Sequence, residues 1–158
     1  MNWSAPRSPQ AESASYTLTL VNQLAELVKL AKWLEGLAGQ LGLSGEDAFK
    51  LELILSEAVT NVIQHGYADA DHGDIEIRVQ DQGNRLRVEV RDKAKPFNPL
   101  EQAEVVFPRT LDEASEGGLG IHLVRTYTEA CFYQRIDHQN VLVMVLAVSR
   151  GEPDKDRM

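Results

Sequence analysis

A pair of alternating apolar segments joined by a short turn most constrains what this chain can fold into. The apolar residues are Ile75, Ile77 and Val79 in the first segment and Leu86, Val88 and Val90 in the second. Charged or polar residues separate them, and the tetrapeptide DQGN occupies positions 81–84 between the two segments. A period of two residues is typical of strands that bury one face, so the sequence predicts a hairpin with one apolar side.

Apolar residues at helical spacing before this hairpin predict two helices that could cover its apolar side. Apolar residues recur at helical intervals from Leu24 to Leu41, and Gly42 follows as a stop. A second helix is expected to open at Ser44 as N-cap, with Asp47 as its capping-box partner. This helix is predicted to run to about His65, where Gly66 fits the end.

The other segments complete the predicted order of elements. Residues 16–21 (YTLTLV) are expected to form a strand, residues 118–130 a helix, and residues 131–136 and 141–148 two strands around a turn at 137–140. The order β-α-α-β-β-α-β-β lacks regular βαβ alternation. It predicts an α+β fold, a two-layer α/β sandwich with a mostly antiparallel sheet and helices on one face.

Composition bounds the class of protein. A chain of 158 residues suits one domain, predicted here over residues 15–150, with mobile tails at 1–14 and 151–158. The single cysteine, Cys131, cannot form an internal disulfide, and residues 1–10 lack an apolar signal-peptide core. These features predict a cytoplasmic protein. A net charge of −8 without a basic cluster argues against nucleic acid or an anionic membrane as main partner.

Glu57 and Asn61 in the second predicted helix are the first candidate functional residues. They are four apart, so they lie on one helix face, beside the apolar stripe that should pack on the sheet. A carboxylate at such an edge can accept a proton from a hydroxyl or water, and an amide oxygen can bind Mg²⁺. Taken alone, the same pair is more commonly a pair of solvated flanking residues.

The segment DKAKPFNP at 92–99 follows the second hairpin strand and is the second candidate. An Asp at a strand end, here Asp92, can accept a hydrogen bond from an exocyclic amine such as that of adenine. The two prolines stiffen the loop, and Phe97 adds apolar surface. Without other evidence, this segment could equally be an ordinary loop with a packed Phe.

A glycine cluster at 117–124 (GGLGIHLV) is the third candidate. Glycines let a backbone approach a ligand closely, and a helix start offers free amides and a positive dipole to phosphate. Many glycine clusters are only flexible turns, so this signal is weak alone. His65 is assigned no role, because it is expected to be partly packed at the helix end. His122 is assigned none either, because no Cys or His stands at metal-ligand spacing from it.

Together, and in this order, the three segments resemble the boxes of the histidine-kinase-like (Bergerat-fold) ATPases. Within that group the chain looks most like the small anti-sigma-factor serine kinases. The family's first box is similar to residues 57–66 (EAVTNVIQHG) of this chain. Its adenine-side box is similar to residues 92–99, and its glycine box is similar to residues 117–125 (GGLGIHLVR). The resemblance covers roughly residues 15–148.

This resemblance implies roles for individual residues. Glu57 would be the catalytic base, Asn61 would help hold Mg²⁺, and Asp92 would bond the adenine amine. Residues 100–116 would form a lid over the ATP. The remaining residues implied to contact ATP are Ala94, Phe97, Gly117, Gly118, Leu119, Gly120 and Ile121.

The resemblance also implies partners. The protein would use MgATP to phosphorylate a small anti-anti-sigma-like antagonist, would sequester a sigma factor or similar regulator, and would form a homodimer. At one position the chain departs from the family pattern, because Ala94 stands where glycine is usual. The extra methyl is expected to crowd the nucleotide. It favours an alternative function, a non-catalytic module that binds ATP or ADP as a switch for protein contacts; ATP hydrolysis that drives lid motion is a third hypothesis.

Overall fold

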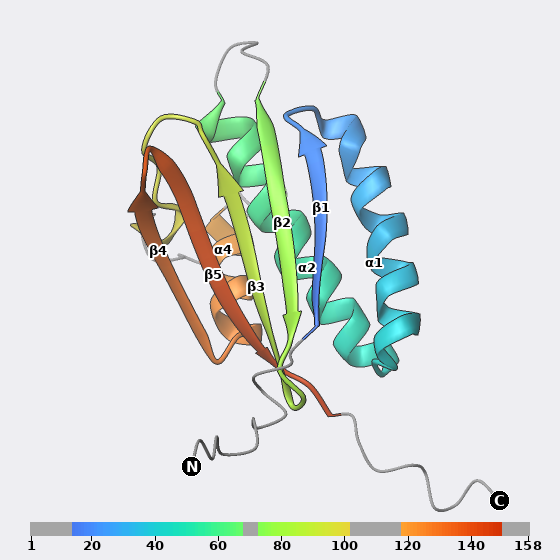
Figure 1. Ribbon diagram of the computed structural model, residues 1–158. Helices are drawn as coiled ribbons and strands as arrows, with labels where there is room; N and C mark the ends of the chain where they lie inside the picture. Colours follow the sequence, from blue (N-terminus) through green and yellow to red (C-terminus); the bar gives the residue numbers. More distant parts are fainter. Residues whose placement is uncertain (1–13, 68–72, 102–117, 150–158) are drawn as a thin grey trace, which may run out of the picture.

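The computed structural model describes residues 14–67, 73–101 and 118–149, and its order of main elements is the predicted one (Figure 1). These are β1 (Ser15–Val21), α1 (Leu27–Leu41), α2 (Gly45–Asn61), β2 (Asp74–Asp81), β3 (Arg85–Asp92), α4 (Gly118–Tyr127), β4 (Ala130–Ile136) and β5 (Gln139–Ala147). The predicted tails and lid fall wholly or mostly outside the described residues. Within the described residues, the helices are too short or too polar to cross a membrane.

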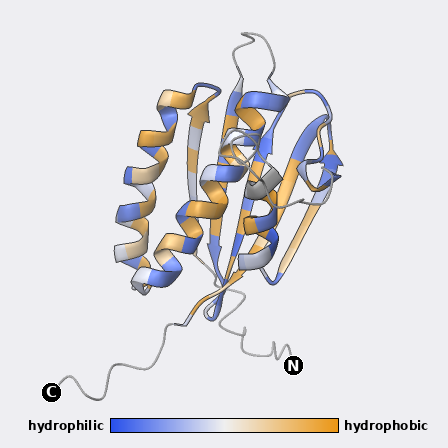
Figure 2. Ribbon diagram, turned by 180° about the vertical axis from the view of Figure 1, so that it is seen from behind, coloured by the Kyte–Doolittle hydropathy of each residue, from blue (hydrophilic) through white to orange (hydrophobic). Residues whose placement is uncertain are grey.

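The five strands form one sheet in the order β1-β2-β3-β5-β4, and every neighbouring pair is antiparallel. The helices α1, α2 and α4 all lie on the same side of this sheet, behind it in Figure 1 and in front of it in Figure 2. The predicted α+β sandwich with an antiparallel sheet is therefore confirmed. No helix of the described residues covers the other face of the sheet.

Register explains where the core lies. Ile77 pairs with Val90, and Val88 pairs with Met144, so their side chains share the helix side of the sheet. All four are buried, and they meet apolar helix side chains, of which Leu30 and Leu55 are completely buried. The alternating pattern that predicted the hairpin thus selects the face on which the helices pack.

The start of α2 agrees with its predicted cap only in part. Ser44 Oγ accepts a hydrogen bond from the Asp47 backbone amide at 3.1 Å, as an N-cap should. The Asp47 carboxylate accepts instead from the backbone amide of Ser149 at 2.9 Å. Asp47 therefore ties the segment after β5 to the helix start, and the capping-box role predicted for it is not the contact that its side chain makes.

Three predicted boundaries differ from the structure, and two of them affect the site. The α-helical part of α2 ends at Asn61 and continues as a π-helical turn over Val62–Gly66. The turn between β4 and β5 is only Asp137 and His138, both with positive φ, so Asn140 belongs to β5. The third helix ends at Tyr127.

Candidate nucleotide-binding site

A pocket of about 350 Å³, a volume that includes its open mouth, lies between the end of α2 and the β3, β4 and β5 strands. The lining residues come from four parts of the chain: Ala58, Asn61, Val62, Gly66, Val90, Asp92, Phe97, Pro99, Tyr133, Asn140 and Leu142. The first and second predicted boxes therefore meet at one cavity, although they are separated by two strands.

Asp92 ends β3 and is 5% exposed, at the wall of this pocket. Its Oδ1 accepts hydrogen bonds from the Ala94 amide at 3.0 Å and from Asn140 Nδ2 at 2.8 Å. Burial raises the pKa of the carboxyl, and the two hydrogen bonds and the nearby Arg135 charge oppose that rise. Both hydrogen bonds found for Asp92 end at Oδ1, so Oδ2 is the oxygen that remains for a donor in the pocket.

Asn61 is the last α-helical residue of α2, and its side chain is 3% exposed within the pocket wall. Its Nδ2 has no hydrogen-bond partner in the described part of the chain. An unpaired buried amide is costly, by about 1–3 kcal/mol, and is uncommon in folded proteins. A half-turn of the amide exchanges Nδ2 and Oδ1, so this side chain can offer either a donor or an oxygen ligand to a bound group.

Glu57 lies one helical turn before Asn61 and is in contact with Gly120, near the start of α4. A Cβ atom placed on Gly120 would come within 1.9 Å of Glu57 Oε2. Burial raises the pKa of this carboxyl above its ordinary value of 4.5. The contact brings the first predicted box and the glycine box together, and the absence of a side chain at position 120 is what makes room for the carboxylate.

Ala94 is not among the residues that line the pocket. Its side chain is directed at Gly66, where a Cβ atom would stand 3.2 Å from Ala94 Cβ. Its backbone contributes more directly, because its amide bonds Asp92 and its carbonyl accepts from Arg135 Nη1 at 2.8 Å. Phe97 does line the pocket, and its ring stacks on His65 with centroids 5.4 Å apart.

The glycine box is only partly described. Gly118 and Leu119 lie in the first turn of α4, and Gly117 lies outside the described residues. Ile121 is 4% exposed and is not among the residues that line the pocket. The structure adds two polar pocket residues that the sequence analysis missed, Tyr133 and Asn140. A polar residue at the start of the apolar run 141–148 was the available signal for Asn140.

The chemistry available here is recognition of a base and handling of a proton. A free oxygen of Asp92 at one end of the pocket can accept from an amine, and the apolar walls formed by Val62, Val90 and Leu142 can hold a flat ring. Glu57 does not line the pocket but lies one helical turn before Asn61, and its carboxylate holds its proton more tightly than an exposed one. No cluster of three or more His, Cys, Asp or Glu side chains that could bind a metal occurs among the described residues.

Comparison with known families agrees with this geometry. The profile described as the histidine kinase-like ATPase domain matches residues 20–146, which include α2, β3, α4 and most of β5. The chain belongs to the histidine kinase-like ATPase family, in the group of the RsbW-type serine-protein kinases.

Relatives named as serine-protein kinases support the assignment to the RsbW-type group. The serine-protein kinase RsbW of Bacillus subtilis is 32% identical over 123 residues, which cover 75% of this chain and 76% of the relative. RsbW of Bacillus velezensis is 35% identical over 123 residues, with the same coverage. The serine/threonine-protein kinase BtrW of Bordetella bronchiseptica is 28% identical over 112 residues, 71% of this chain and 79% of that protein.

A solved structure agrees on the fold. The crystal structure of the RsbU and RsbW domains of a Mycobacterium tuberculosis protein matches with a TM-score of 0.62 and 16% sequence identity. The match covers 87% of this chain and only 33% of that longer chain. It therefore supports the arrangement of helices and strands and says nothing about substrates.

Proposed function

We propose that this protein is an anti-sigma factor and serine/threonine protein kinase. It uses ATP to phosphorylate a small antagonist protein, and it sequesters a sigma factor or a similar regulator. The observation that carries the proposal is that Asn61 and Asp92 line one pocket while Glu57, one helical turn before Asn61, contacts Gly120 of the glycine box, in a chain of the RsbW-type group. Because ATP is the phosphoryl donor, the proposal places the protein in the cytoplasm.

The adenine end of ATP fits the wall formed by β3 and β5. Asp92 Oδ2 would accept a hydrogen bond from the exocyclic amine, while the apolar side chains of the pocket contact the ring faces. The phosphates would extend toward the start of α4, where free backbone amides and the helix dipole favour negative charge. Phosphoryl transfer depends mainly on such positioning and charge stabilisation.

Mg²⁺ is part of the proposal, and Asn61 is the residue that would help hold it. The fit rests on the buried, unpaired amide of Asn61, which has an oxygen to offer after a half-turn. A single protein ligand is compatible with Mg²⁺, which keeps several waters and takes further ligands from substrate phosphates. When bound, the ion would neutralise charge on the transferred phosphoryl group.

Glu57 would act as general base. Its carboxylate would take the proton from a serine or threonine hydroxyl of the antagonist, whose oxygen then bonds the γ-phosphorus as the bond to the β-phosphate oxygen breaks. ADP and a phosphorylated antagonist are the products. Burial makes Glu57 a stronger proton acceptor than an exposed carboxylate, since it raises the pKa.

Calorimetry with ATP, with and without Mg²⁺, tests the pocket first. The parent is expected to bind more tightly with Mg²⁺, and Asn61→Ala is expected to lose that dependence. Transfer from γ-labelled ATP to the antagonist tests the base: Glu57→Ala should bind ATP and lose transfer. A parent that binds ATP, regulates its partner and transfers nothing would instead be the non-catalytic switch.

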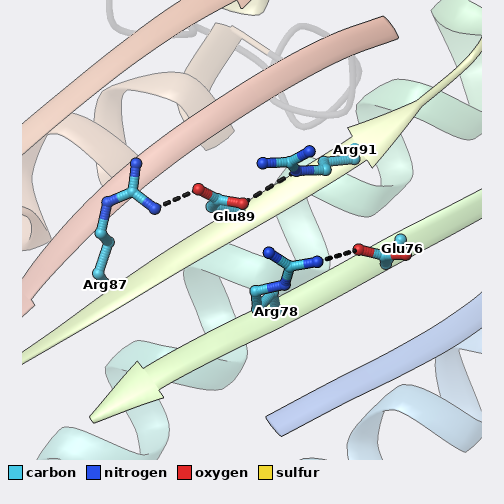
Figure 3. Close-up of polar contacts among 5 residues, drawn as sticks. All are labelled: Glu76, Arg78, Arg87, Glu89 and Arg91. Atoms are coloured by element: carbon cyan, nitrogen blue, oxygen red, sulfur yellow. Dashed lines mark hydrogen bonds and ion pairs between the residues drawn. The ribbon is translucent and has the colours of Figure 1, made fainter. Parts of the chain in front are cut away.

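A homodimer is also part of the proposal, formed through the sheet face that the helices leave uncovered. On this face β4 presents Phe132 and Ile136, 39% and 43% exposed, and β5 separates them from the charged rows of β3 and β2 that Figure 3 shows. The rows carry both signs, so a second copy turned by a two-fold axis can pair opposite charges. Light scattering should give a dimer that Phe132→Asp converts to a monomer and Val28→Asp on α1 does not.

A further inference from the structure

Asn140 makes hydrogen bonds to several residues on the proposed adenine side of the pocket. It is the second residue of β5, one residue after the two-residue turn of the β4–β5 hairpin has ended, and it is 5% exposed. Its position next to Asp92 follows from the sheet, because Asp92 and Asn140 are paired in the register of β3 and β5. A buried side-chain amide needs hydrogen-bond partners for both its nitrogen and its oxygen.

The amide nitrogen of Asn140 points at one segment of chain. Nδ2 donates to Asp92 Oδ1 at 2.8 Å, to the Lys95 carbonyl at 2.9 Å and, at the longer distance of 3.4 Å, to the Ala94 carbonyl. All three acceptors lie at the end of β3 and in the loop that follows it. One side chain therefore fixes both the Asp92 carboxylate and the path of the loop behind it.

The amide oxygen of Asn140 is equally engaged. Oδ1 accepts from the Phe97 amide at 3.2 Å, from Arg135 Nη1 at 3.1 Å and from the Tyr133 hydroxyl. Since an amide oxygen has two lone pairs and the nitrogen two hydrogens, these contacts use the whole hydrogen-bonding capacity of the side chain. Asn140 is left with nothing to offer a ligand directly, although it forms part of the pocket wall.

Arg135 acts on the same loop from the other strand of the hairpin. Its Nη1 bonds the Ala94 carbonyl at 2.8 Å as well as Asn140 Oδ1. The side chain is exposed, so its removal leaves no buried cavity. Together Asn140 and Arg135 connect the β4–β5 hairpin to Asp92 and to residues 94–97.

We propose that Asn140, supported by Arg135, is a positioning residue that makes the pocket selective for a base with an exocyclic amine. By occupying Oδ1 of Asp92, it leaves Oδ2 as a fixed acceptor directed into the pocket. An amine can donate to that oxygen, whereas a base with a carbonyl at the same place would bring two acceptors together. This inference rests on the proposed function, since it concerns how the same pocket selects ATP.

The test compares ATP with ITP, in which a carbonyl replaces the amine of adenine. In the parent, calorimetry should show tighter binding of ATP than of ITP. Asn140→Ala frees the Asp92 carboxylate to turn, so ATP affinity should fall about tenfold or more while ITP affinity changes little. The ATP-to-ITP preference should therefore shrink, which a general loss of stability would not produce. Gln134→Ala, on the uncovered face of the same hairpin, is the matched control and should keep the preference.

Two further variants keep the inference testable if Asn140→Ala folds poorly. Arg135→Ala removes an exposed side chain and should reduce the preference in the same direction by a smaller factor, about threefold. In an Asp92→Ala background, both variants should have little additional effect on ATP affinity, because their action passes through Asp92. The inference alone would be overturned if the parent prefers ATP to ITP and if Asn140→Ala and Arg135→Ala keep the same ATP-to-ITP preference as the parent. A parent that binds neither nucleotide would overturn the proposed function and this inference with it.

Discussion

The Glu57 carboxylate occupies the space that a side chain on Gly120 would need. A Cβ atom there would stand 1.9 Å from Oε2 and 2.6 Å from Cδ, distances that no real side chain tolerates. The atoms in conflict belong to the far end of a flexible side chain, so Gly120→Ala is expected to fold and to displace Glu57. We predict a loss of phosphoryl transfer of about tenfold or more, since a misplaced base forfeits most of its contribution.

Single-turnover transfer, measured together with ATP affinity, checks this prediction. Gly39→Ala in α1 is the matched control, because a Cβ atom there meets nothing within 4 Å. That control should transfer at the parent rate and gain about 0.5–1 kcal/mol in free energy of unfolding, since alanine is the better helix residue. Full transfer by Gly120→Ala would mean that the observed position of Glu57 is not the one used in the reaction.

Protonation of Glu57 should link activity and stability to pH in opposite directions. Burial raises its pKa above 4.5, so the folded protein binds this proton more tightly than the unfolded chain does. Ionised Glu57 therefore reduces stability as pH rises from 4.5 through the raised pKa, while the same ionisation supplies the base. Glu57→Gln is expected to unfold at a higher temperature than the parent at pH 7, to lose that advantage below pH 4.5, and to transfer no phosphate.

Thermal unfolding of both proteins between pH 4 and pH 8 tests the stability part, and transfer rates over the same range test the catalytic part. The parent rate should rise with pH on its acid side, with a midpoint above 4.5. Equal stability of Glu57→Gln and the parent at every pH would show that the carboxylate is better solvated than its contact with Gly120 indicates.

Local pattern was sufficient to predict the fold. Alternation in residues 75–79 and 86–90 identified the strands and their buried side, and the order of elements then left few arrangements besides helices on one face. The end of α2 was not predictable in the same way. Gly66, the last residue of the π-helical turn at Val62–Gly66, packs against Ala94, which lies 28 residues further along the chain, and local pattern does not show such a contact.

The residues of the site were likewise predictable from the sequence only in part. Glu57, Asn61 and Asp92 could be selected because a helix face and a strand end place polar groups predictably, and the family resemblance supplied their roles. Asn140 was assigned to a turn, since nothing local distinguishes a turn of four residues from a tight turn of two. Its hydrogen bond to Asp92 follows from the pairing of β3 with β5, which brings together residues 48 positions apart.

The contact between Gly66 and Ala94 predicts that the two positions depend on each other. A Cβ atom on Gly66 would lie 3.2 Å from Ala94 Cβ and 3.5 Å from Val62 Cγ1. The Ala94 methyl has no rotamer by which to move away, so the backbone must shift, and Gly66→Ala is expected to cost about 1–3 kcal/mol of folding free energy. The double variant Gly66→Ala, Ala94→Gly moves the methyl group across the contact and should recover most of that loss.

Urea unfolding of the parent, both single variants and the double variant measures the coupling as a cycle. Ala94→Gly alone should cost less than Gly66→Ala, because it removes a methyl without creating a clash. If the double variant is as unstable as the sum of the single ones, the two residues do not share the space that the structure assigns to them.

Glu89 on the uncovered sheet face should make part of the stability depend on acid. It is 4% exposed and bonds Arg87 and Arg91 (Figure 3). Burial raises its pKa, but the hydrogen bonds and charges of the two arginines outweigh burial and bring the pKa below 4.5. The resulting stability is present above 4.5 and is lost as pH falls through the lowered pKa.

Glu89→Gln is therefore expected to cost about 1–3 kcal/mol at pH 7, because it weakens two charged hydrogen bonds at a buried position. The difference from the parent should shrink as the pH is lowered below 4.5. Glu76→Gln is the matched control: Glu76 pairs with Arg78 on the same face, but its side chain is 39% exposed, so its loss should cost at most about 1 kcal/mol. Urea unfolding at several protein concentrations separates this effect from any change in dimerisation, because only the dimer's contribution depends on concentration. Equal costs for the two variants would show that the burial of Glu89 adds nothing to its ion pairs.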